Sequence, residues 1–163
     1  MNYYISAGTF VAYGRQRERF REGELVEKWA ESYPNLFDAD NVRIARSQAH
    51  LGYHFWEWLA AIVLYNCTGY LSLVEQYQFR NHRSKQRILR DLLPSEVGQF
   101  ISSGRGTQCP DLLAYMPDYS DWFFCEVKGP RDRTSAAQAE YFRELAEISG
   151  KPIAILKFKL IRV

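Results

Sequence analysis

The pattern of apolar and polar positions predicts helices through the first part of the chain. Apolar side chains recur near helical spacing over residues 15–33, with an interruption at Gly23 and an end at Pro34. A second helix is expected over about 46–67, where Thr68 and Gly69 close it. Because this second segment is apolar on nearly every side, we expect it at the centre of the fold.

The middle of the chain changes to patterns typical of strands. Residues 70–79 alternate between mostly apolar odd positions and mostly polar even positions, which predicts a strand. A basic stretch then leads into a short helix that ends before Pro94, and residues 101–109 are predicted to form a glycine-containing loop. Segments 111–116 and 122–128 are short apolar strands separated by turn residues, so we expect them to form a hairpin.

A helix and a strand complete the chain. Residues 135–149 carry apolar side chains on one helical face, and Gly150 and Pro152 end the helix. Residues 153–158 form the last predicted strand, and a strand, helix and strand in this order imply a right-handed parallel crossover. The sequence therefore predicts one α/β domain with a mixed sheet of about four strands. The main helix should cover one face and the crossover helix the other.

Composition narrows the class of protein. The chain has 163 residues, 47% apolar and 25% charged, which is typical of one globular domain. Its three cysteines are odd in number and lack metal-binding spacing, so we expect neither a disulfide framework nor a zinc site. No apolar run reaches the roughly 18 residues of a membrane span. The net charge of +2 means that contact with a polyanion would depend on local basic patches.

Candidate chemistry gathers around the predicted hairpin. Glu126 and Lys128 alternate with apolar residues on one strand and therefore share a face. Asp111 opens the partner strand, so antiparallel pairing places it near both. Two carboxylates in close contact repel each other unless a proton or a cation lies between them, and oxygen ligands suit Mg²⁺ or Mn²⁺. The alternative is a structural ion pair, since Glu and Lys are common residues.

The motifs around these residues resemble a nuclease family. GRGTQCPDLL at 104–113 and FCEVKGPRDRTSAAQ at 124–138 resemble the VRR-NUC branch of the PD-(D/E)xK nucleases, specifically over 104–145 and more broadly over 45–163. The resemblance implies a restriction-endonuclease-like fold that cuts phosphodiesters with a divalent metal. It implies Asp111, Glu126 and the Val127 carbonyl as metal ligands, and Lys128 as the residue that orients water and stabilises phosphate charge.

Two further residues are candidates for the same site. Gln138 completes the family pattern, although SAAQ at 135–138 is also a helix capping box. Glu57 stands alone in the apolar second helix and matches, by position, the Glu that many members carry before the first strand. Its rival is Glu75, and the alternatives for Glu57 are a salt bridge to an arginine or simple exposure. Residues 1–44 resemble nothing known and are expected to form a helical N-terminal extension of the 45–163 nuclease core.

Basic residues flank the predicted site and are candidates for phosphate contact. Those in the loops next to the two strands are Arg105, Arg131 and Arg133. Those in the preceding basic stretch are Arg83, Lys85 and Arg87.

We therefore expect a metal-dependent nuclease acting on DNA, with junction, flap or nicked DNA as candidate substrates. The alternatives are a catalytically silent nucleic-acid-binding or interaction subunit and an RNA-directed nuclease. The resemblance also implies a homodimer, because stand-alone relatives tend to pair. We expect a cytoplasmic protein of bacterial or phage origin, with no membrane partner.

Overall fold

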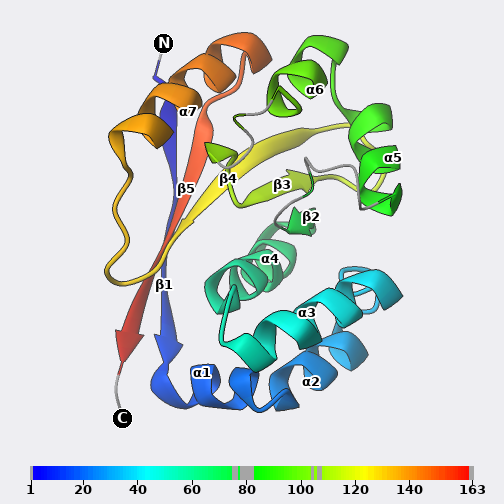
Figure 1. The fold of residues 1–163 in the computed structure, drawn as a ribbon, viewed down its shortest axis with the longest axis vertical. Helices are drawn as coiled ribbons and strands as arrows, with labels where there is room; N and C mark the ends of the chain where they lie inside the picture. Colours follow the sequence, from blue (N-terminus) through cyan, green and yellow to red (C-terminus); the bar gives the residue numbers. More distant parts are fainter. Residues whose placement is uncertain (1, 75–76, 78–82, 104, 106–107, 162–163) are drawn as a thin grey trace.

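The computed structural model describes residues 2–74, 77, 83–103, 105 and 108–161. Within them, five strands form one mixed sheet in the order β1-β5-β4-β3-β2 (Figure 1). The strands are β1 (Tyr4–Tyr13), β2 (Leu71–Val74), β3 (Leu112–Tyr115), β4 (Trp122–Lys128) and β5 (Ile153–Ile161). The helices are α1 (Gly14–Arg21), α2 (Glu24–Ser32), α3 (Ala39–Leu51), α4 (Phe55–Thr68), α5 (Arg83–Leu92), α6 (Ser95–Ile101) and α7 (Ala136–Ser149). None of the described helices is long and apolar enough to cross a membrane.

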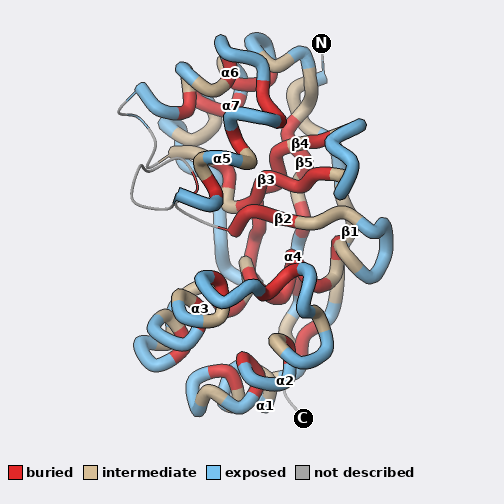
Figure 2. Tube along the Cα trace, turned by 90° about the vertical axis from the view of Figure 1, so that its right-hand side faces the viewer, coloured by how far each residue is buried: buried red, intermediate tan, exposed pale blue. Residues whose placement is uncertain are grey.

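The sheet is covered on both faces, as Figure 1 shows. On β4, Cys125 and Val127 pack in one apolar cluster with side chains of α4 such as Trp58. Phe124 points the other way and packs with residues of α5, α6 and α7, such as Phe142. The central strands β3 and β4 are consequently buried, whereas most of β1 is intermediate or exposed, as are the outer faces of the helices (Figure 2). This confirms the predicted α/β class, a mixed sheet flanked by helices, which is consistent with a restriction-endonuclease-like fold.

The single helix predicted over 46–67 is wrong, because the chain breaks it into α3 and α4. Gly52 adopts a left-handed conformation with φ 75° and its N–H donates to the carbonyl of Ala49, which ends α3. His54 is also left-handed, with φ 63°, and precedes the first residue of α4. Apolar residues continue through both helices, so hydrophobic periodicity alone did not indicate the turn between them.

The helical extension predicted for residues 1–44 is wrong over its first part. Residues 4–13 form β1, an edge strand that pairs in parallel with β5 from Tyr4 opposite Ile153 to Tyr13 opposite Ile161. The register shifts between Ser6 and Gly8, and this irregularity obscures the alternation expected of a strand. α1, α2 and the start of α3 are helical as expected. The N-terminal residues therefore belong to the same sheet as the predicted core.

The turn between α3 and α4 generates a stability prediction. We expect Gly52→Ala to lower the free energy of unfolding by about 1–2 kcal/mol, because a Cβ disfavours the left-handed conformation. The new Cβ would also lie 3.3 Å from Nε of Arg21. Gly98→Ala is the control: Gly98 lies in α6 with open space around it, so alanine should leave stability unchanged or raise it by up to about 1 kcal/mol. Urea denaturation measures both, and equal effects would contradict the prediction.

Candidate active site

The register of the β3–β4 hairpin places Asp111 against the end of β4. Leu112 lies opposite Cys125 in this antiparallel pair, and Asp111 immediately precedes Leu112. The Asp111 carboxylate reaches across the hairpin, where its Oδ2 accepts a hydrogen bond from the Val127 N–H at 2.8 Å. The predicted meeting of Asp111 with the end of the partner strand is confirmed.

Glu126 and Lys128 lie side by side on the sheet face that α7 covers. Their residues are only 3% and 7% exposed, so both charges are taken out of water. The Lys128 Nζ donates to Oε1 of Glu126 at 2.6 Å, and Gln138 Nε2 donates to the same oxygen at 3.2 Å. Burying these charges is tolerable only because each has a partner of suitable chemistry.

Gln138 fulfils both roles considered for it. Its backbone N–H donates to Oγ of Ser135 at 3.1 Å, and its Oε1 accepts the Ser135 N–H at 3.2 Å. These two bonds form the capping box at the start of α7. Because the cap uses Oε1 while Nε2 contacts Glu126, one side chain ties the first turn of α7 to the carboxylate on β4.

The electrostatics of Glu126 are dominated by burial. Burial raises the pKa of Glu126, and the neighbouring Lys128 and Asp111 counteract that rise. Its second oxygen, Oε2, is buried and has no hydrogen-bond partner among the described residues. An electron-rich oxygen without a donor, next to a second carboxylate, suits a hard divalent cation such as Mg²⁺ or Mn²⁺.

Glu57 lies in the first turn of α4, the helix that packs over the Cys125 face of the sheet. Its Oε1 is 3.6 Å from Nδ1 of His54, and its buried Oε2 has no hydrogen-bond partner in the described part of the chain. No three His, Cys, Asp or Glu side chains among the described residues gather closely enough to hold a metal ion. Glu75, the rival candidate, lies outside the described residues, so a third acidic ligand stays a prediction.

The predicted phosphate-contacting residues fall into different environments. Arg131, Arg133, Arg83 and Arg87 are exposed. Arg105 is held against α7, where its guanidinium pairs with Glu144 at 2.6 Å and lies over the ring of Phe100. The four exposed arginines therefore present their charge to solvent, whereas the Arg105 guanidinium is paired with Glu144 on α7.

Lys85 does not fit its predicted role as a surface contact to phosphate. The residue is 4% exposed and its Nζ donates to the Val74 carbonyl at 2.6 Å, at the end of β2. α5 turns Lys85 inward together with Leu89, because the two lie four residues apart on one helical face. The alternation of basic and polar residues in this stretch suggested an exposed charge and concealed the inward face.

A buried tyrosine that the sequence analysis did not single out holds the start of β3. The Tyr77 hydroxyl donates to the carbonyl of Pro110 at 2.6 Å and lies 3.2 Å from the Cys109 sulfur. Burial raises the pKa of Cys109 to about 12, so its thiol stays protonated. Because Pro110 directly precedes Asp111, this bond fixes the backbone from which the carboxylate extends.

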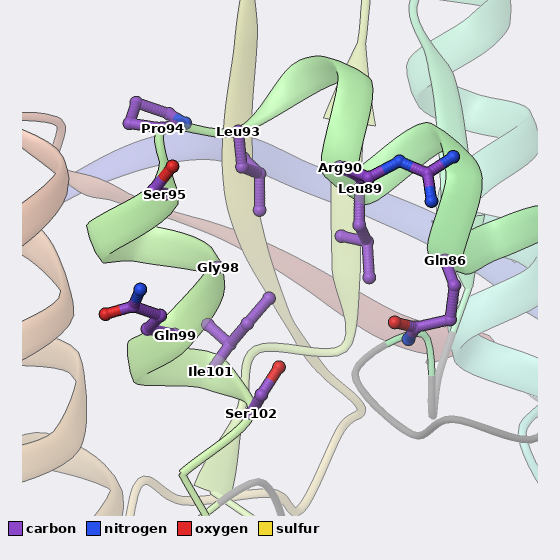
Figure 3. Close-up of a pocket in the computed structure, with 10 residues that line it drawn as sticks. All are labelled: Gln86, Leu89, Arg90, Leu93, Pro94, Ser95, Gly98, Gln99, Ile101 and Ser102. Atoms are coloured by element: carbon purple, nitrogen blue, oxygen red, sulfur yellow. The ribbon is translucent and has the colours of Figure 1, made fainter.

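Two surface hollows lined by described residues are compared with the candidate site. One, of about 360 Å³, opens between α5 and α6, where Figure 3 shows Leu89, Leu93 and Ile101 together with Arg90. Its lining includes none of Asp111, Glu126 or Lys128, so it is separate from the candidate site. The other, of about 490 Å³, is lined by Lys128 itself and by residues of β5 and of the loop after β4.

Comparison with known proteins gives a structural likeness but no match in sequence. No protein-family model matches the chain, and no curated protein sequence matches it. Among solved structures, a crystal structure of paFAN1 bound to DNA with a two-nucleotide 5′ flap and a gap is similar, with 18% identity and a TM-score of 0.39. The match covers 78% of this chain, which spans about 25% of that protein's chain.

The double role of Gln138 generates a test. Gln138→Glu keeps an acceptor for the cap but places a carboxylate against Glu126, so we expect a loss of about 1–3 kcal/mol of unfolding free energy at pH 7. Repulsion raises the folded-state pKa of the new pair. The deficit should therefore be largest above that pKa and should shrink as the pH falls toward 4.

Urea denaturation at several pH values measures this deficit. Ser135→Ala is the control, because it removes a cap acceptor worth about 1 kcal/mol without adding charge. A Gln138→Glu deficit that matches this control at every pH would show that the contact with Glu126 has no energetic weight.

Proposed function

We propose that this protein is a divalent-metal-dependent nuclease that hydrolyses phosphodiester bonds in DNA. The observation that supports this most is the convergence of Asp111, Glu126 and Lys128 at the end of a buried hairpin. Burying two carboxylates and an ammonium group together costs free energy, and further hydrogen bonds from the Val127 N–H and the Gln138 side chain hold the carboxylates in position. The motif resemblance to VRR-NUC nucleases over 104–145 supports DNA as the substrate.

In this proposal the Asp111 and Glu126 carboxylates and the Val127 carbonyl hold Mg²⁺ or Mn²⁺. Such an ion, when bound, lowers the pKa of a water molecule and stabilises negative charge on phosphate oxygens. Lys128 and Gln138 both donate to Oε1 of Glu126, which leaves Oε2 as the oxygen available to the cation. Asp111 is oriented by the Val127 N–H through its Oδ2.

Lys128 has a second task in the reaction. Lys128 lines the hollow of about 490 Å³, and we propose that its ammonium group contacts a phosphate oxygen bound there. Because Glu126 already holds the Lys128 ammonium group in place, this group needs little rearrangement to stabilise the charge that develops as the phosphodiester is attacked. Action on branched DNA and pairing of two chains are parts of the proposal that the resemblance alone supports.

Cleavage of labelled DNA tests the proposal directly. Single-stranded, duplex, flap and four-way-junction substrates are incubated with Mg²⁺, Mn²⁺ or EDTA. We expect metal-dependent cutting, and a loss of about 10²–10³-fold or more in both site variants. Asp111→Ala removes a proposed metal ligand, and Lys128→Ala removes the ammonium group proposed to stabilise the phosphate charge. Asp91→Ala, on the exposed face of α5, should retain activity.

Each outcome of the cleavage assay has a definite meaning. No cutting by a folded wild-type protein would favour the catalytically silent binding subunit. Cutting of RNA alone would favour the RNA-directed nuclease. Equal cutting by the wild type and Asp111→Ala would place the activity elsewhere.

Metal binding gives an independent prediction. Mn²⁺ at 100 times its dissociation constant should stabilise the wild type by about 2.7 kcal/mol, because only the folded chain brings Asp111 and Glu126 together. Thermal unfolding with Mn²⁺ and with EDTA measures the difference. Asp111→Ala and Glu126→Ala should lose the stabilisation while Asp91→Ala keeps it, and an Mn²⁺ shift unaffected by both site variants would contradict the proposed ligands.

A further inference from the structure

The hollow beside Lys128 is basic and opens onto an uncovered part of the sheet. It forms where the end of β4, the loop at 129–135, the start of α7 and β5 meet, and its volume is about 490 Å³. Arg133 and Lys157 line it together with Lys128, against one acidic residue, Asp132. Asp132 is engaged in holding the loop, since its Oδ2 accepts the Gly129 N–H at 2.8 Å.

The pairing of β5 with β4 places two further lysines beside the candidate site. Lys157 on β5 is the parallel partner of Lys128 on β4, so the two side chains emerge next to each other on one face. Lys159 lies two residues further along β5 and therefore on the same face, about 7 Å beyond Lys157. The line Lys128, Lys157, Lys159 runs from the candidate site toward the C-terminal end of β5.

Among the described helices, α7 covers this face of the sheet only near the start of β5. β1 and β5 continue past α7, with the loop after β4 alongside them (Figure 1). Lys157, Lys159 and Arg133 are exposed, in contrast to the buried Glu126 and Lys128. Within the described ranges, none of these three exposed cations takes part in an ion pair, so their charge is available to a ligand.

We propose that Arg133, Lys157 and Lys159 bind the phosphodiester backbone of the DNA strand beside the bond to be cut. This inference rests on the proposed nuclease function and adds the path of the substrate. The roughly 7 Å between the two lysines is more than the axial rise of about 3.4 Å per phosphate in one strand of a duplex, so each lysine can contact a different phosphate. Contacts of this kind position the strand without reading its sequence.

The test compares the binding of fluorescent duplex and flap DNA by fluorescence anisotropy, in EDTA so that no cutting occurs. The double variant Lys157→Ala/Lys159→Ala is compared with Lys28→Ala/Arg43→Ala, which removes the same charge from exposed positions on α2 and α3. Circular dichroism and thermal unfolding establish that both variants are folded. The salt concentration is varied in each case.

We expect the β5 double variant to bind at least tenfold more weakly at 0.15 M salt. Each lost phosphate contact should reduce the slope of log K against log salt by about 0.9, so the double variant should lose nearly 2. The α2–α3 control should match the wild type in affinity and slope.

Two other outcomes separate this inference from the proposed function. If the wild type binds and cuts DNA but the β5 variant binds like the control, the strand takes another path and the nuclease proposal stands. If the wild type binds neither DNA substrate and cuts none, the proposed function fails and this surface fails with it.

Discussion

The register of the β3–β4 hairpin is the constraint on which the candidate site depends. Pairing Leu112 with Cys125 brings the residue before β3 level with the last residues of β4. The Asp111 carboxylate can then accept the Val127 N–H. A slip of one residue would send Glu126 and Lys128 to the opposite face, away from α7 and Gln138.

The apolar layers on both sides of the sheet give this register its strength. Phe124 on one face and Cys125 on the other are each fully or almost fully buried, so any slip would exchange two different sets of packed side chains. The same burial raises the free-energy cost of placing charged groups at the end of β4. The fold compensates by giving Glu126 two donors on one oxygen, one from its own strand and one from α7. Stability of the core and preorganisation of the carboxylate are therefore linked.

The sequence correctly predicted those helices and strands whose first and last residues are set by neighbouring residues in the chain. The strand at 122–128 and the start of the helix after Ser135 agree with the structure, because an apolar run and a capping box are local signals. β1 was missed because the register shift near Gly8 interrupts its alternation, and its place in the sheet depends on β5 at the far end of the chain. Lys85 was misjudged because only the packing of α5 decides which of its faces is buried.

The same limit applies to the basic residues that would contact a nucleic acid. In the sequence, the arginines clustered between 80 and 90 were candidates for phosphate contact, whereas the two lysines that alternate with apolar residues in the last strand were not singled out. Their meaning depends on the strand they pair with: Lys157 is the partner of Lys128, so the charge on β5 continues from the candidate catalytic lysine. Because parallel pairing joins segments about 30 residues apart through α7, no local pattern could indicate this alignment. The crossover that covers one end of the sheet thus leaves the other end open beside the site, where a long polyanion can approach.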